Sequence, residues 1–266
     1  MRRELLVLIC GLVAVTFVSA ARGADPNTDG WEFKAAPYIW AVSLDGDMTV
    51  KGNTVAVDVN IIDIIKESDS IFALEGYFEA RKGRWGGFID GTYADLSMGG
   101  NVGPLSTDVD FTYWLVDFAA FYRVGTWSLN GASDGSGQDL SLEVLAGGRY
   151  TAMDVELDIS TPGPSTVVDK RQDWVDPIVG ARVFLDLTDD LSLVFRGDIG
   201  GFGVGSDLSW NVAGLLFYDF DLFGRDASVI AGYRVLDQDF EDGSGANKFA
   251  YDVTTHGPIL GMVIRF

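Results

Sequence analysis

The chain has 266 residues, of which 47% are hydrophobic and 12% are aromatic, and it contains 33 glycines. Its 39 acidic and 19 basic residues give a net charge of −20, which excludes the basic surface that nucleic-acid binding requires. The single cysteine, Cys10, lies near the N-terminus, so the rest of the chain forms no disulfide and carries no thiol chemistry.

The N-terminus has the residue order of a cleaved export signal. Arg2 and Arg3 form a charged start, an apolar stretch covers 5–18, and small residues follow it. The apolar stretch is shorter than the roughly 20 residues of a membrane-spanning helix. We therefore predict a signal peptide over 1–24 and one domain over 25–266. Because the signal peptide carries three Arg and one Glu, a net +2, the mature chain carries −22.

Apolar and polar residues alternate along the mature chain with the period of two that is typical of β-strands. The sequence predicts ten strands, at 32–49, 70–82, 84–97, 108–124, 139–156, 173–187, 190–204, 208–220, 226–239 and 249–266. Ten is an even number, as bacterial single-chain transmembrane barrels require.

The connections between these strands differ in length. Short ones at 82–84, 188–190 and 223–226 are predicted to be periplasmic turns. The longer connections are predicted to be outer loops, at 50–69, 98–107, 157–172 and 240–248. Two connections depart from this alternation, because 125–138 is long on the periplasmic side and 205–207 is short on the outer side.

Within the first outer loop, residues 54–59 alternate and are compatible with a hairpin against 47–51, and 61–66 are compatible with a helical turn. A hairpin that also spans the membrane would raise the strand count to twelve. Farther along, glycines crowd 200–205, which indicates either strand coiling or a surface against which the 50–69 loop folds inward.

Alternation alone does not separate a membrane barrel from a soluble sandwich, because both have one apolar face. The export signal and the terminal Phe266 decide for a barrel. Aromatic residues at predicted strand ends also favour it, because aromatic girdles belong there; they are Trp85, Tyr150, Trp174, Trp210 and Tyr218. The fold class is therefore all-β, a transmembrane antiparallel up-and-down barrel of about ten strands.

Charged residues on the inward face are the most informative internal feature. The predicted lumen network comprises Glu75, Glu79, Arg81, Asp90, Asp117, Arg123, Glu143, Arg149, Asp176, Arg182, Asp186, Arg196, Asp198, Arg234 and Arg265. Every base in this network is Arg, whose planar fork pairs with carboxylates through two hydrogen bonds. Two interpretations stay open: a polar channel that orients a solute, or a closed polar core filled by its own side chains.

Acidic residues gather in the outer loops, at 58–69, 154–158 and 237–242. This favours a solvated acidic rim that divalent cations bridge to lipopolysaccharide, and a cation-attracting funnel is the alternative. Residues 237–243 lack the twelve-residue spacing and closing Glu of a calcium loop. We predict no metal site and no cofactor.

His256 is the only histidine, and we place it in the upper lumen. Asp252, four residues earlier on the same strand, would lie about 13 Å away, so a catalytic pair would need a carboxylate from another strand. The chain has neither a Gly-x-Ser-x-Gly nor a His-Glu-x-x-His motif. We predict no catalytic residues and expect that the protein is not an enzyme.

The last strand alternates to the end of the chain, with an apolar face formed by Leu260, Met262, Ile264 and Phe266. A closing strand with a terminal aromatic residue is typical of bacterial outer-membrane barrels. We therefore predict that this face is the signal for the barrel assembly machinery.

Several segments carry a family resemblance: 36–40 (APYIW) with 44–46 (LDG), 79–86 (EARKGRWG), 174–182 (WVDPIVGAR), 196–206 (RGDIGGFGVGS), and 251–252 (YD) with 256–258 (HGP). Over nearly all of its mature length the chain resembles a family of largely uncharacterised proteobacterial outer-membrane β-barrel, porin-like proteins. The resemblance implies an outer-membrane barrel and brings no substrate and no catalytic residues. The chain departs from the family at 126–138, where relatives tend to have a tight turn.

Three functional hypotheses follow. The first is a porin-like channel for small solutes, with selectivity set by the Arg–carboxylate lumen. The second is a closed structural or adhesion barrel that acts through its acidic outer loops. The third is a barrel hydrolase, similar in strand number to the omptin proteases, for which the sequence offers no motif.

Overall fold

The computed structural model describes residues 30–102, 105–129, 138–160 and 166–266. The predicted signal peptide at 1–24 and the centre of the 125–138 connection lie outside these residues. The strands are β1 (Trp31–Trp40), β2 (Ser43–Val50), β3 (Asn53–Val59), β4 (Ser70–Lys82), β5 (Trp85–Val102), β6 (Leu105–Ser128), β7 (Asp139–Ser160), β8 (Thr166–Asp186), β9 (Leu191–Gly201), β10 (Leu208–Leu222), β11 (Arg225–Asp242) and β12 (Phe249–Arg265). Two short helices accompany them, α1 (Ile61–Glu67) and the 3₁₀-helix η1 (Gly245–Asn247).

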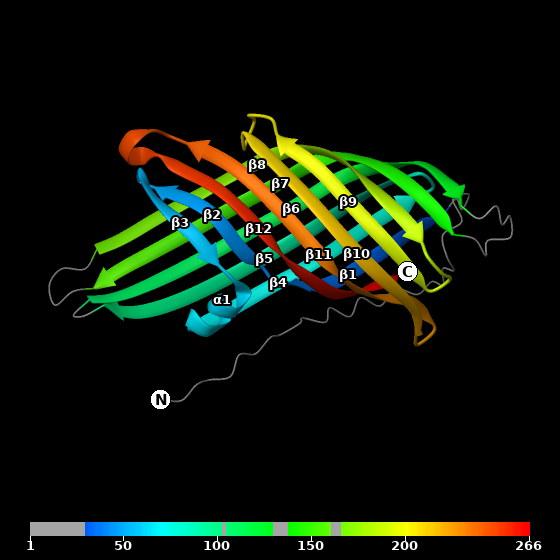
Figure 1. Ribbon diagram of the computed structural model, residues 1–266, viewed down its shortest axis with the longest axis horizontal. Coiled ribbons are helices and arrows are strands. Elements are labelled where there is room, and N and C mark those ends of the chain that lie inside the picture. Colours follow the sequence, from blue (N-terminus) through cyan, green and yellow to red (C-terminus); the bar gives the residue numbers. More distant parts are fainter. Residues whose placement is uncertain (1–29, 103–104, 130–137, 161–165) are drawn as a thin grey trace.

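Ten of the strands form a closed antiparallel barrel (Figure 1). Each strand from β4 to β11 pairs with its successor, β1 pairs with β4, and β12 pairs back with β1. The remaining two strands, β2 and β3, form a hairpin that extends the sheet at β12. The ten-stranded fold and the additional hairpin are both confirmed. In the described part of the chain, no helix is long and apolar enough to cross a membrane.

The first predicted strand, 32–49, is wrong as a single element. β1 ends at Trp40 and β2 begins at Ser43, and the two pair with different parts of β12. At the break, the Ala41 N–H donates to the Pro258 carbonyl at 3.0 Å. The predicted helical turn at 61–66 is α1, and the Asn60 side chain caps it by accepting from two backbone N–H groups.

Three prolines lie where a ladder of hydrogen bonds is interrupted. Pro37 lies at the two-residue gap in the pairing of β1 with β12, and Pro258 lies opposite the break between β1 and β2. Pro177 precedes Ile178, where the pairing of β8 with β9 begins. Proline has no backbone N–H to donate, so strands accommodate it where a partner is missing.

The predicted outer loops at 98–107 and 157–172 are mostly strand. β5 continues to Val102, and β7 and β8 pair as far as Ile159 and Thr166, well beyond the tips of β9 and β10 (Figure 1). The outer part of β8 pairs with β7 on one side, but β9 is too short to pair with it on the other side. Lys170, Arg171 and Pro177 occupy this edge, and such residues discourage pairing with another chain.

The glycine run at 200–205 covers the end of β9 and the tight turn into β10, so the prediction of a strand as far as 204 is wrong. Gly201 and Gly203 have φ values of +86° and +72°, and the Val204 N–H donates to the Gly201 carbonyl at 3.0 Å. The turn brings Ser206 inward, where its N–H and its Oγ donate to the Asp176 carboxylate at 2.6 and 2.9 Å. Asp176 and Ser206 are fully buried, so this turn seals one side of the lumen.

A pair of glycine substitutions tests the role of this turn. Both Gly201→Ala and Gly203→Ala place a residue with a Cβ in the left-handed backbone conformation, which costs about 1–2 kcal/mol of stability. A Cβ at Gly201 would also lie 2.5 Å from the Ser206 carbonyl oxygen, whereas one at Gly203 meets nothing within 4 Å. We expect Gly201→Ala to lower the urea midpoint of unfolding of the refolded barrel by clearly more than Gly203→Ala. Equal shifts would contradict this account of the turn.

Candidate functional site

The periplasmic half of the lumen holds a group of buried charges, here called the periplasmic cluster. It consists of Lys34, Glu79, Arg81, Arg123, Glu143 and Arg182. Arg182 joins the two carboxylates, with its Nη atoms 2.7 Å from Glu79 and 2.7 Å from Glu143. Four cations therefore surround two carboxylates, and the cluster carries an excess of positive charge.

A second group, the central cluster, lies farther out along the lumen. It consists of Asp90, Asp117, Arg149, Arg196, Asp198 and Arg234. Arg149 is fully buried and donates to Asp117 at 2.7 Å, to Asp198 at 2.8 Å and to Ser209 at 2.8 Å. Because buried charges cost several kcal/mol each unless they are paired, this network is a condition for folding.

Two acids of the central cluster, Asp90 and Asp117, are direct partners on neighbouring strands. Like charges in that position repel. Arg234 relieves the repulsion by contacting both, at 3.3 Å and 3.0 Å, and Arg196 contacts them at 3.7 Å and 2.8 Å. The pairing explains why bases from β9 and β11 reach across the lumen to acids on β5 and β6.

Aromatic rings cover the guanidinium groups. Arg182 lies 4.3 Å from the ring centre of Phe121, Arg196 lies 4.9 Å from Phe88, and Arg234 lies 4.7 Å from Trp40. Arg is weakly hydrated and stacks well on aromatic faces, which offsets part of the cost of removing it from water. The rings and charges together fill the middle of the barrel.

The outer half of the lumen is closed by apolar side chains, here called the outer aromatic cluster. Its buried members are Met153, Trp174, Phe240, Phe249, Tyr251 and Val253. Trp174 of β8 stacks on Phe240 of β11, with ring centres 4.1 Å apart. Leu44, Met48 and Val50 pack on the cluster, so the β2–β3 hairpin contributes to the closure.

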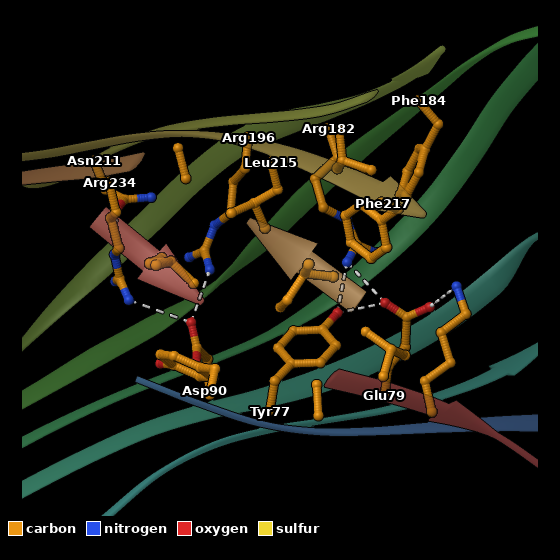
Figure 2. A pocket seen from close by; sticks show the side chains of 18 of the residues that line it. Tyr77, Glu79, Asp90, Arg182, Phe184, Arg196, Asn211, Leu215, Phe217 and Arg234 are labelled. Carbon is orange, nitrogen blue, oxygen red and sulfur yellow. Dashed lines mark hydrogen bonds and ion pairs between the residues drawn. The ribbon is translucent and has the colours of Figure 1, made fainter. Parts of the chain in front are cut away.

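A cavity of about 140 Å³ remains beside the clusters, toward the periplasmic end (Figure 2). Lys34 and Arg265 line it, and their side chains are 26% and 27% exposed. Arg182, Arg196 and Arg234 line one side together with Leu215 and Phe217 of β10. Tyr77, Glu79 and Asp90 lie across from them (Figure 2).

The structure places most of the predicted lumen charges in the two clusters. Four of them lie elsewhere. Glu75 accepts from the Trp40 backbone N–H, Asp176 binds Ser206, and Arg265 donates to Asp219 at 3.0 Å. Asp186 is exposed at the end of β8. The predicted place of Trp174 in an aromatic girdle is wrong, because it lies inside and is only 5% exposed.

Sequence reasoning missed the uncharged members of the lumen. Tyr77 accepts from Arg182 at 2.7 Å, Tyr38 donates to Asp90 at 2.6 Å, and Asn211 donates to Asp198 at 2.8 Å. The alternation of residues along each strand could have placed them on the inward face. Tyr77, for example, is two residues from Glu79 and therefore lies on the same face of β4.

His256 is not in the lumen. It lies on the outer surface of the wall, where its Nε2 is 2.7 Å from Asp45 and its Nδ1 is 2.6 Å from the Tyr233 hydroxyl. Asp45 is the carboxylate from another strand that a catalytic pair would need. The three residues connect β2, β12 and β11, and they hold the hairpin against the wall.

Much of the exterior wall of the barrel is apolar while its interior is charged, the reverse of a soluble protein. Phe72, Leu74 and Phe78 are 44–52% exposed along β4. Near the periplasmic ends, Trp85 and Tyr218 are 64% and 56% exposed, as in an aromatic girdle. The protein is an integral outer-membrane β-barrel.

No family model matches the chain, and no curated protein matches it. Among solved structures, it is similar to Ail, the attachment invasion locus protein of Yersinia pestis, in complex with the heparin analogue sucrose octasulfate (14% identity, 90% of this chain and 100% of that chain, TM-score 0.31). It is also similar to the translocator domain of the autotransporter NalP from Neisseria meningitidis (12% identity, 91% of this chain and 90% of that chain, TM-score 0.35). A third similar structure is that of a Pseudomonas aeruginosa FadL homologue (8% identity, 91% of this chain and 91% of that chain, TM-score 0.30). At these values the similarities carry no inference about function.

Replacing Arg149 tests the central cluster. Arg149→Met leaves Asp117 and Asp198 without one of their buried partners. We therefore expect a loss of about 3–5 kcal/mol in the free energy of unfolding. Arg84→Met, in an exposed turn, is the matched control and is expected to change stability by less than about 1 kcal/mol. Urea unfolding in micelles, followed by tryptophan fluorescence, measures both. Similar values for the two variants would contradict a structural role for the network.

Proposed function

We propose that the protein is a closed outer-membrane barrel that acts through its outer surface rather than as a porin-like channel. The observation that carries this proposal is the complete burial of Asp117 and Arg149 in the central cluster and of Glu143 in the periplasmic cluster. Side chains from β4, β8, β9, β10 and β11 contact these three residues of β6 and β7. The geometry thus favours the closed alternative over the open one.

The outer aromatic cluster supports the same conclusion. It lies between the central cluster and the outside, so a solute would have to pass two consecutive closures of different chemistry. Displacing the aromatic side chains would expose apolar surface, and separating the ion pairs would cost several kcal/mol for each charge.

The outward face of β11, β12, β2 and β3 is strongly acidic. Asp239 pairs with Asp252, and Asp252 pairs with Asp47, so three carboxylates lie side by side across neighbouring strands. A second row adds Asp45 opposite Asp58. We call these five residues the acidic face, and we propose that it contacts cationic groups at the cell surface.

The titration of Asp239 supports this role. Partial burial, together with the negative charges of Asp252, Asp207, Asp237 and Glu241, raises the pKa of the Asp239 carboxyl above its ordinary value. An acid with a raised pKa is destabilising in its ionised form, and a bound cation relieves that cost. Cation binding is therefore expected to weaken as the pH falls toward the pKa of this group.

Several sequence predictions stay predictions within this proposal: membership of the proteobacterial family, a non-enzymatic role, recognition of the last strand by the assembly machinery, and divalent cations between the outer acids and lipopolysaccharide. Among the described residues, no group of three or more His, Cys, Asp or Glu side chains is arranged to hold a metal ion. A bridging cation would therefore need ligands from the lipopolysaccharide phosphates as well.

Conductance in a planar bilayer tests the closed lumen. We expect the refolded mature barrel to insert and to stay electrically silent, because buried ion pairs block the middle of the lumen. The double variant Trp174→Ala/Phe240→Ala is expected to stay silent too, since it leaves the central cluster in place. A porin recorded in the same bilayers controls for insertion and detection. Stable openings of the wild type would overturn the closed barrel and restore the channel, with Asp117, Glu143 and Arg149 as the first residues to change.

Binding of a fluorescent lysine decapeptide to the barrel in phosphatidylcholine nanodiscs tests the acidic face. The variant Asp47→Asn/Asp239→Asn/Asp252→Asn is expected to lose about 0.2–1 kcal/mol of binding per carboxylate, measured by fluorescence anisotropy at low salt. A variant with the same charge change in periplasmic turns, Asp189→Asn/Asp190→Asn/Asp226→Asn, is the control. Equal losses for the two variants would show that only net charge matters and would overturn the assignment of this face.

A further inference from the structure

The cavity of about 140 Å³ has two chemically different walls. Leu215, Phe217, Ile230, Ile259 and Val263 of β10–β12 form the apolar wall. Cationic side chains complete the lining, with Lys34 on β1 and Arg182 on β8, and Arg265 of β12 adjoins the apolar wall as the register partner of Lys34. A cavity with this division fits a ligand that has an apolar body and an anionic end.

The two acids that line the cavity do not cancel its positive charge. Glu79 is held by Arg182 at 2.7 Å and by Lys34 at 3.4 Å, and Asp90 accepts from Tyr38 at 2.6 Å and contacts Arg234 at 3.3 Å. Both carboxylates are thus engaged by the clusters. Of the periplasmic cluster, Lys34, Arg182 and Glu79 line the cavity, which makes two cations and one carboxylate.

Lys34 and Arg265 provide a second, independent observation. They are direct register partners on β1 and β12, and both line the cavity at its periplasmic end. Directly opposed like charges are destabilising. An anion placed between the two side chains would relieve this repulsion. Arg265 also forms an ion pair with Asp219 at 3.0 Å, which fixes its guanidinium at the periplasmic end of the cavity.

We propose that this cavity binds a small amphipathic carboxylate from the periplasmic side, with the carboxylate at Lys34 and Arg265 and the apolar body against β10–β12. The size is appropriate, since a cavity of about 150 Å³ lined by apolar side chains holds benzene. A benzoate-sized molecule therefore matches both walls. The site is separate from the acidic face, and it takes a ligand without any passage through the barrel.

The test uses 4-fluorobenzoate as the probe, with the full mature barrel in nanodiscs and ¹⁹F NMR as the readout. We expect saturable binding by the wild type. Lys34→Met/Arg265→Met is expected to weaken it about tenfold or more, equivalent to about 1.4 kcal/mol. The control variant Lys82→Met/Arg84→Met removes the same two charges from an exposed periplasmic turn and is expected to bind as the wild type does.

Two further measurements distinguish the contribution of the apolar lining from that of the cationic side chains. Ala213→Leu adds bulk to the cavity lining without changing any charge and is expected to abolish binding. The neutral probe 4-fluorobenzyl alcohol is expected to bind about tenfold more weakly than the carboxylate. The heat-dependent gel mobility of folded barrels verifies that each variant has folded.

Three results would overturn the proposal. They are no saturable binding by the wild type, equal binding by the Lys34→Met/Arg265→Met variant and its control, or equal affinity for the neutral and the anionic probe. The readout here is binding alone, so the outcome does not depend on whether the barrel conducts in the bilayer experiment. The closed barrel and the carboxylate site can therefore be disproved independently of each other.

Discussion

Pairing of buried charges in the lumen is the constraint on which the rest of the structure depends. A ten-stranded wall has room inside for side chains, and lipid outside forces the polar half of every strand inward. Each Arg then needs a carboxylate from another strand. Arg149, which joins acids of β6 and β9, shows how the network also fixes which strands face each other across the lumen.

The period of two was sufficient to predict the barrel strands, apart from the division of 32–49 into β1 and β2, and their inward charges. It also indicated a hairpin in the first outer loop. It was not sufficient to predict pairing. Asp176 resembled any other lumen acid in the sequence, yet its partner is Ser206, in the short connection predicted at 205–207. The strand predicted to reach 204 ends at Gly201, so the turn is longer than predicted. Trp174 alternates with the inward set, but its aromatic character favoured a girdle. Partners across the lumen depend on register and tilt, which no local pattern contains.

The chain distributes its charge asymmetrically between the lumen and the outer surface of the wall. The periplasmic cluster has more cations than carboxylates, whereas the acidic face sets carboxylates opposite one another on the outer part of the wall. These regions share no residue. The barrel thus separates an inward cationic cavity from an outward anionic surface, and the neutral central cluster lies between them.

The seam where β1 meets β12 joins the first and the last strand of the barrel, with partners such as Lys34 and Arg265, and it has a gap at Pro37. Bringing together residues so distant in sequence carries a large loop-closure entropy. Closure of this ladder therefore belongs to the last stage of folding, and its amide protons should exchange with solvent sooner than those of the long β6–β7 ladder. The wall has a built-in order of assembly, with a strong central hairpin and a late, weakly bonded junction.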